Sequence, residues 1–144
     1  MHNNAASFLV IVMMALGFIS CSGLTNNRAE TNPDHPDASL RPRTYTVAYD
    51  SFFETVLHVI GWLPRWKVVE QDIENGKIGA TRQTKFFRFV DDVEIHVTKK
   101  GEGEVTVNLR SASRVGKGDF GQNARNIREF LKALDREIAA DTRP

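Results

Sequence analysis

The chain has 144 residues, of which 41% are hydrophobic and 26% are charged. That length accommodates one domain, and the composition is typical of a globular protein rather than a disordered one. The 19 basic and 18 acidic residues leave a net charge of +1, without a basic stripe, so nucleic-acid binding is not expected. The single cysteine, Cys21, excludes an intrachain disulfide and a multi-thiolate metal site.

The N-terminal segment has the features of an export signal. No Lys, Arg, Asp or Glu precedes Arg28, and an uninterrupted apolar run extends from Phe8 to Ile19. The run fits a signal-peptide core and is shorter than the roughly 20 residues that span a bilayer. It ends in Phe18-Ile19-Ser20-Cys21, which resembles the lipobox of bacterial lipoproteins, where small residues precede a lipidated cysteine.

We therefore predict a signal peptide over residues 1–21 and lipidation of Cys21. The protein would then be a lipoprotein of the cell envelope, attached to the membrane through a lipid anchor outside the cytoplasm. An ordinary cleaved signal peptide and an uncleaved membrane anchor are the alternatives, and both also place the domain outside the cytoplasm.

Residues 22–43 are polar and contain three of the five prolines. A segment of this composition cannot bury a core, so it predicts a flexible tether. Fully extended, it would reach about 70 Å. The folded domain is then expected over residues 44–140.

The spacing of apolar residues predicts a short strand over residues 44–48, followed by a helix. Ser51 and Glu54 have the spacing of a capping box, in which a hydroxyl and a carboxylate satisfy the free amides of a helix start. Gly61 is typical of a helix end, so the first helix is expected to stop there.

Four strands are expected next, over residues 66–71, 77–83, 92–98 and 105–110, with a tight turn at Asn75-Gly76. In the last two, apolar and polar residues alternate on either side of a hairpin loop at 100–103. Such alternation is typical of an antiparallel sheet with one buried face, and it places Arg110 on the wet face opposite Asp92 or Glu94.

A long helix is predicted at the C-terminal end of the domain. Asp119 is placed to cap it, with Gln122 three residues later, and an apolar stripe extends from Ala124 to Ile138. The expected order is β-α-β-β-β-β-α. The predicted fold class is α+β, an antiparallel sheet of about five strands with two helices on one face.

The segment from Arg110 to Phe130 reads RSASRVGKGDFGQNARNIREF. It resembles the signature of the family filed as domain of unknown function 1499, which runs Arg-Ser-x-Ser-Arg-x-Gly and later Asp-x-Gly-x-Asn. Phe89-Val90-Asp91-Asp92 and Leu63-Pro64-Arg65-Trp66 resemble two further segments of that family. The resemblance covers about residues 44–138 and implies the family's fold there, but no activity, because the family has none assigned.

The connection between the last strand and the last helix is the predicted binding site, for a protein partner or an anionic group. Its glycines allow backbone amides to turn inward, a helix N-terminus is partially positive, and Arg114 and Lys117 add charge. The site near the 111–125 loop would be non-catalytic. Its predicted residues are Arg110, Ser111, Ser113, Arg114, Gly116, Lys117, Asp119 and Asn123.

The same residue types also fit a self-satisfied structural turn. Asp119 would then only cap the helix, Arg114 would pair with Asp91 or Asp92, and Asn123 would hold the loop by hydrogen bonds.

No motif of a nucleophilic enzyme is present, and Ser113 has no histidine near it in the sequence. Catalytic residues are therefore not assigned and no cofactor is expected, although a hydrolase-like enzyme using the same loop is kept as an alternative. A structural accessory of a membrane complex is another. Asp92, Glu94 and His96 share a strand face, but such side chains diverge, so we expect no metal site there.

Overall fold

The computed structural model of the chain describes residues 27–141. It contains a short 3-10 helix, two α-helices and six strands. In chain order these are β1 (Arg28–Glu30), η1 (Ala38–Leu40), β2 (Arg43–Thr46), α3 (Tyr49–Trp62), β3 (Trp66–Asp72), β4 (Lys77–Gln83), β5 (Val90–Gly101), β6 (Glu104–Ser113) and α4 (Gln122–Asp141). The predicted signal peptide and Cys21 lie outside the described residues. None of the helices within residues 27–141 is long and apolar enough to cross a membrane.

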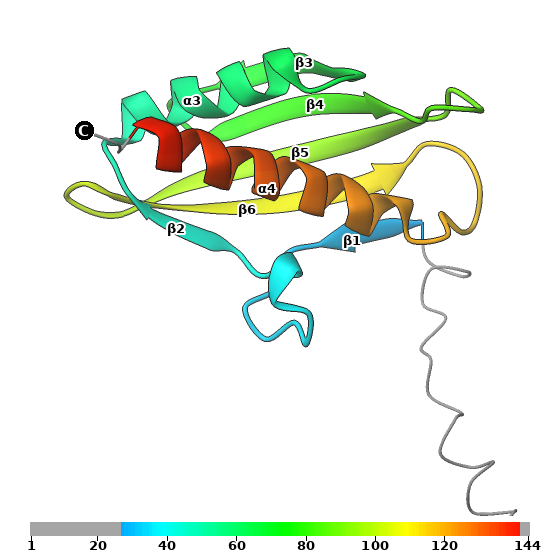
Figure 1. Cartoon of the computed structure of the whole chain (residues 1–144), viewed down its shortest axis with the longest axis horizontal. Helices are drawn as coiled ribbons and strands as arrows, with labels where there is room; N and C mark the ends of the chain where they lie inside the picture. The colour runs from blue at the N-terminus through cyan, green and yellow to red at the C-terminus, as the bar shows by residue number, and fades with distance from the viewer. Residues whose placement is uncertain (1–26, 142–144) are drawn as a thin grey trace, which may run out of the picture.

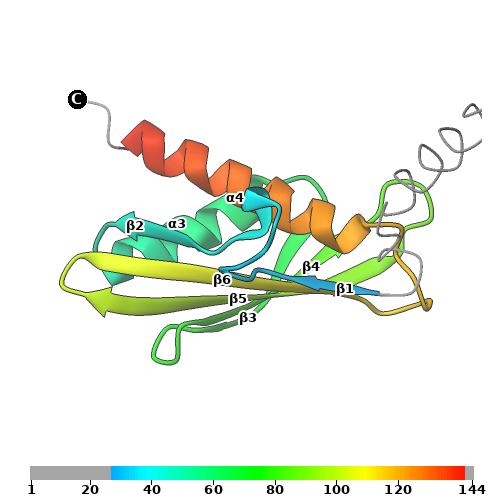
Figure 2. The same cartoon turned by 90° about the horizontal axis from the view of Figure 1, so that it is seen from below.

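All six strands form one antiparallel sheet in the order β1-β6-β5-β4-β3, and β2 also pairs with β6. Both α-helices lie on the same side of this sheet (Figure 1, Figure 2). The predicted α+β class and the order of elements from β2 onward are therefore confirmed. The sheet has six strands rather than about five, because β1 adds to the edge of β6.

The core lies between the sheet and the helices. In the central hairpin, Ile95 pairs with Leu109 and Val97 with Val107, and all four side chains are buried. The predicted register is thus confirmed, and it places Arg110 beside Glu94 on the uncovered face, 2.9 Å from its carboxylate.

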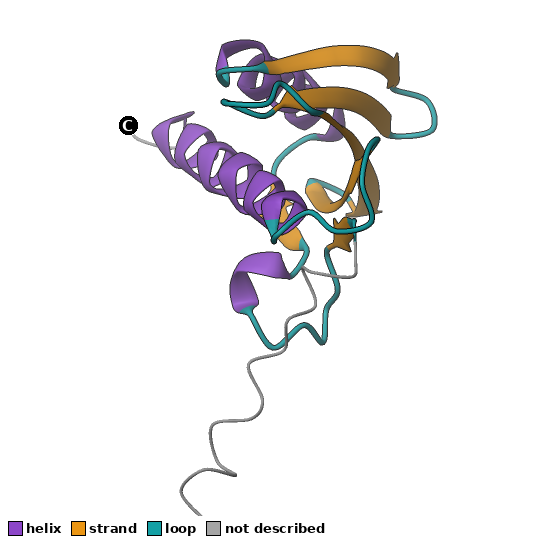
Figure 3. Ribbon diagram, turned by 90° about the vertical axis from the view of Figure 1, so that its right-hand side faces the viewer, coloured by secondary structure: helices purple, strands orange, loops and turns teal. Residues whose placement is uncertain are grey.

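Each helix contributes a stripe of buried residues at helical spacing. In α3 the stripe includes Phe52, Val56 and Ile60, and in α4 it includes Ile127, Phe130, Leu131 and Leu134. Burying one such side chain contributes about 1.5–3 kcal/mol relative to leaving it exposed. The sheet curves, and α4 lies within its curvature (Figure 3).

The interpretation of residues 22–43 as a flexible tether is wrong from residue 27 onward. β1 pairs with residues 110–112 of β6, and Leu40 of η1 is only 5% exposed within the core. Asp37 caps η1 and also binds Arg128 of α4 at 2.6 Å. The segment folds because β2 pairs only with residues 104–107 on the outer edge of β6, which leaves residues 110–112 of that edge open to β1. The polar composition of the segment does not reveal this.

The predicted capping box at the start of α3 is also wrong. The helix begins at Tyr49, two residues before Ser51, and its N-cap, Ala48, makes no side-chain hydrogen bond. Only Val47 and Ala48 separate β2 from α3, so the helix starts as soon as the chain leaves the sheet. Ser51 lies in the first turn, where its carbonyl accepts a hydrogen bond from Thr55 Oγ1.

Candidate functional site

The connection between β6 and α4 lies at one end of the sheet, next to the connection between β4 and β5 (Figure 1). The backbone amide of Arg114 donates to the carbonyl of Val90 at 3.2 Å, which holds the two connections together. Asn27 lies at the same end, where its Nδ2 donates to the Gly116 carbonyl at 3.2 Å. We call residues 84–89 and 114–121 the loop end.

A closed ring of hydrogen bonds lies beneath the loop end. Ser111 Oγ donates to Asn123 Oδ1 at 2.7 Å, and Asn123 Nδ2 donates to Ser113 Oγ at 3.0 Å. Ser113 Oγ donates in turn to Asp91 at 2.7 Å. Asn126 Nδ2 completes the ring, donating to Asp91 at 2.8 Å and to Ser111 Oγ at 3.2 Å.

These five residues form a polar core that joins β5, β6 and α4. Ser111, Asn123 and Asn126 are fully buried, and Asp91 is 1% exposed. Within the described residues, no buried side-chain nitrogen or oxygen atom lacks a hydrogen-bond partner. Ser111, Ser113 and Asn123 were predicted as binding residues, but their hydrogen-bonding groups are directed into the protein.

Asp119 caps α4, as both interpretations of the loop expected. Its two carboxylate oxygens accept hydrogen bonds from the amides of Gly121, at 2.9 Å, and Asn123, at 2.7 Å. Gly116 and Gly121 have φ angles of +95° and +78°, which favour glycine. Because a carboxylate already occupies this helix N-terminus, an external anion would have to compete with it.

The three predicted cationic residues lie in different surroundings. Arg114 donates hydrogen bonds to the Asp92 carboxylate from Nε and Nη2 at 2.7–3.0 Å. These hydrogen bonds, together with the charge of Asp92, raise the pKa of Arg114. Arg110 lies away from the loop end, in its pair with Glu94. Lys117 is exposed and has no hydrogen bond or ion pair within the described part of the chain.

The most conspicuous feature of the loop end was not predicted. Five of the eight exposed large hydrophobic side chains in the described residues lie here: Phe86 (83% exposed), Phe87 (77%), Phe89 (49%), Val115 (64%) and Phe120 (75%). Phe87 and Phe89 stack with ring centroids 5.6 Å apart, and Lys85 Nζ lies 5.6 Å from the centre of the Phe86 ring. The signal in the sequence is Lys85-Phe86-Phe87-Arg88-Phe89, a dense aromatic run between two strands.

The backbone of the loop end is strained at two of these positions. Arg88 and Phe120 have φ angles of +54° and +50°, in the left-handed region that side chains other than glycine rarely adopt. Each costs roughly 1 kcal/mol, and such strain concentrates at functional sites.

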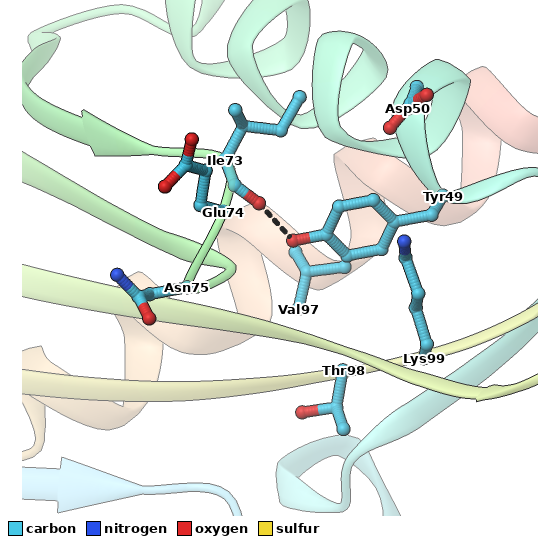
Figure 4. A pocket seen from close by; sticks show the side chains of 8 residues that line it. All are labelled: Tyr49, Asp50, Ile73, Glu74, Asn75, Val97, Thr98 and Lys99. Atoms are coloured by element: carbon cyan, nitrogen blue, oxygen red, sulfur yellow. Dashed lines mark hydrogen bonds between the residues drawn. The ribbon is translucent and has the colours of Figure 1, made fainter.

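A groove of about 560 Å³ lies at the opposite end of the sheet (Figure 4). Tyr49 donates its hydroxyl hydrogen to the Ile73 carbonyl at 2.6 Å, and the Lys99 ammonium lies 4.4 Å from the centre of the Tyr49 ring. Burial, with the charges of Asp50 and Asp72, raises the pKa of Tyr49. Tyr49 is thus the side chain of the groove that both of these contacts hold in place. Within residues 27–141, no three His, Cys, Asp or Glu side chains are grouped to hold a metal ion.

The family model described as "Protein of unknown function (DUF1499)" matches residues 19–134. The chain belongs to this family. The segments in which we noted a resemblance to this family contain Asp91, Ser111, Ser113 and Asn123, which are four of the five members of the buried ring. In this chain, those four residues therefore help to join the sheet to α4.

Solved structures also resemble this member of the family. The di-domain ARO/CYC protein BexL from the BE-7585A biosynthetic pathway is 17% identical, with a TM-score of 0.54 over 81% of this chain and 48% of BexL. The chain thus spans about half the length of BexL. The Zhui aromatase/cyclase from Streptomyces sp. R1128 is 15% identical, with a TM-score of 0.41 over 79% of this chain and 87% of that chain. At 17% identity, the likeness to BexL shows the fold alone. None of the curated proteins compared with the chain matches it.

Proposed function

We propose that this chain is a lipid-anchored protein of the cell envelope whose domain is a non-catalytic binding module, and that the loop end is its binding surface. The exposed phenylalanines support this proposal most directly. Apolar side chains gathered on a surface are unfavourable in water, and such patches typically mark sites of interaction. The aromatic run also adjoins the loop that the sequence singled out.

The buried ring supports the same location. A binding surface made of loops needs a rigid base, because ordering a mobile loop costs conformational entropy on binding. The polar ring, the Asp119 cap and the Arg114–Asp92 pair together brace the loop end from below. Ser111, Ser113 and Asn123 of the predicted site thus support the binding surface, while the neighbouring aromatic side chains form it.

The contacts of Ser113 do not favour the hydrolase alternative. An activated serine needs a base that takes its proton and a group that orients that base. Ser113 Oγ donates to Asp91 and accepts from Asn123, and none of its hydrogen bonds within the described residues involves a histidine. The anchor is supported by the apolar run and by the lipobox-like sequence that ends in Cys21.

Two measurements test the proposal. Metabolic labelling with a radioactive fatty acid is expected to mark the wild type and not Cys21→Ala. A photoreactive phenylalanine analogue at Phe87 is expected to give cross-linked products in intact envelopes, whereas one at Val69, which is 56% exposed on β3, gives none. Fatty-acid labelling of Cys21→Ala would disprove the anchor, and equal cross-linking at the two positions would disprove the binding surface.

A further inference from the structure

We infer that the partner of the loop end is the membrane itself, and that its exposed phenylalanines insert into an anionic bilayer surface. This inference rests on the proposed function, which supplies the anchor at Cys21. It assigns a second, non-covalent membrane contact to the folded domain.

Asn27 connects the loop end to the proposed anchor by a short stretch of chain. The Asn27 carbonyl accepts hydrogen bonds from the Ser113 amide, at 2.9 Å, and from Asn123 Nδ2, at 2.7 Å, so Asn27 is fixed at the loop end. Six residue steps separate Asn27 from Cys21. Even fully extended, they span only about 20 Å. A lipid on Cys21 would therefore hold the loop end close to the headgroups.

The side chains of the loop end have the chemistry of a membrane interface. Phe86, Phe87 and Phe120 are each at least three-quarters exposed. Aromatic and aliphatic side chains of peripheral proteins enter the boundary between headgroups and acyl chains to a depth of about 5–10 Å. The two loops that carry these rings lie side by side at the end of the sheet where β1 begins (Figure 1).

The charge of the loop end favours an anionic membrane over the apolar segment of residues 8–19 as the group that covers it. Residues 84–89 contain Lys85 and Arg88 and no acidic residue. In the second loop Lys117 is exposed, and Arg114 is paired with Asp92. Asp119, the one acidic residue of the loop end, is bound to two backbone amides. Each basic side chain at an anionic surface favours contact by about fivefold. The apolar run of residues 8–19 has no acidic residue to attract these cations.

Fluorescence quenching in vesicles tests the inference on the lipid-anchored full chain. The protein is reconstituted into phosphatidylglycerol–phosphatidylcholine vesicles whose acyl chains carry bromine, which quenches tryptophan within the bilayer. Phe87→Trp is expected to add a strongly quenched component to the signal of Trp62 and Trp66. The matched control is Lys100→Trp, at the exposed hairpin on the opposite end of the sheet, which is expected to add an unquenched component.

The charges are tested in the Phe87→Trp background. Lys85→Gln combined with Lys117→Gln is expected to lower the quenching in anionic vesicles, and vesicles of phosphatidylcholine alone are expected to give less quenching than anionic ones. Equal quenching at positions 87 and 100 would overturn the inference, since the domain would then have no preferred orientation. The inference would also be overturned if the Trp at position 87 were unquenched while the photoreactive analogue at the same position cross-linked to a protein or to residues 1–20. In both cases fatty-acid labelling of Cys21 would still succeed, so the anchor would stand.

Discussion

Asn126 donates a 2.8 Å hydrogen bond to Asp91, although the two residues are 35 positions apart and both are almost completely buried. This bond ties the second turn of α4 to the start of β5. Asn126→Leu would leave Asp91 with one unpaired carboxylate oxygen in the interior. Since a buried polar group without a partner costs about 1–3 kcal/mol, we expect a comparable loss in the free energy of unfolding, measured by urea denaturation.

Arg114→Ala provides the comparison with an exposed interaction in the same region. The Arg114–Asp92 pair is about half exposed on both sides, so water replaces it at little cost. The variant is therefore expected to fold with nearly unchanged Tm. If Arg114→Ala unfolds the domain while Asn126→Leu is tolerated, our assignment of the brace to the buried ring is wrong.

Asp119→Ala is expected to destabilise the domain by roughly 1 kcal/mol, because it removes the acceptor for two amides at the start of α4. Asp119→Asn retains an oxygen that can accept one of them and should lose less. Chemical denaturation of both variants gives the comparison, and a larger loss for the asparagine variant would contradict the cap.

Gly76 and Gly103 have similar φ angles, so substituting each by alanine distinguishes the cost of backbone strain from the cost of a steric clash. Gly76 and Gly103 have φ angles of +66° and +70°. A Cβ on Gly76 would lie 2.1 Å from the Val97 carbonyl oxygen, whereas one on Gly103 would meet nothing within 4 Å. Gly103→Ala should therefore cost only the strain of about 1 kcal/mol, and Gly76→Ala considerably more. Thermal unfolding of the two variants measures the difference, and equal losses would show that the turn at Gly76 yields.

The attachment of η1 should weaken in acid. Hydrogen bonds from Ser39, followed by the hydrogen bond and charge of Arg128, hold the pKa of Asp37 well below its usual range. A carboxyl whose pKa is lowered on folding stabilises the protein above its unfolded pKa of about 4 and loses this contribution as the pH falls further. The difference in Tm between wild type and Asp37→Asn should thus shrink below about pH 4. A difference that stayed constant from pH 7 to pH 2 would contradict this assignment.

Periodicity in the sequence was enough to predict α3, β5, β6 and α4, because each of these elements alternates or repeats within its own residues. β3 does not alternate, and the tight turn expected at Asn75-Gly76 helped to locate it beside β4. Val93, Ile95 and Val97 mark a buried strand face without any knowledge of their partners. β1 has only three residues, Arg-Ala-Glu, and no pattern of its own. It is a strand because β6 offers it an edge, and such a tertiary cause has no local signal.

The candidate site was predictable to the extent that its contacts are local. The cap at Asp119 involves amides only two and four positions ahead of it. The pair between Arg114 and Asp92 follows from the predicted pairing of β6 with β5. The alternative in which Asn123 holds the loop by hydrogen bonds is the one that its contacts match. The ring as a whole joins residues up to 35 positions apart, so the sequence could not show that Ser111 faces inward. The exposure of Phe86 and Phe87 was missed for a related reason, since burial of an aromatic residue depends on what packs over it.

The bonds to the Asn27 carbonyl also have a mechanical consequence. Tension on the chain from its N-terminal side would act first on this carbonyl, which is held by one donor from β6 and one from α4. The load would therefore divide between the sheet and the C-terminal helix before it reached β1. A protein built in this way can be pulled from its N-terminal side without its edge strand being the first element to separate from the sheet.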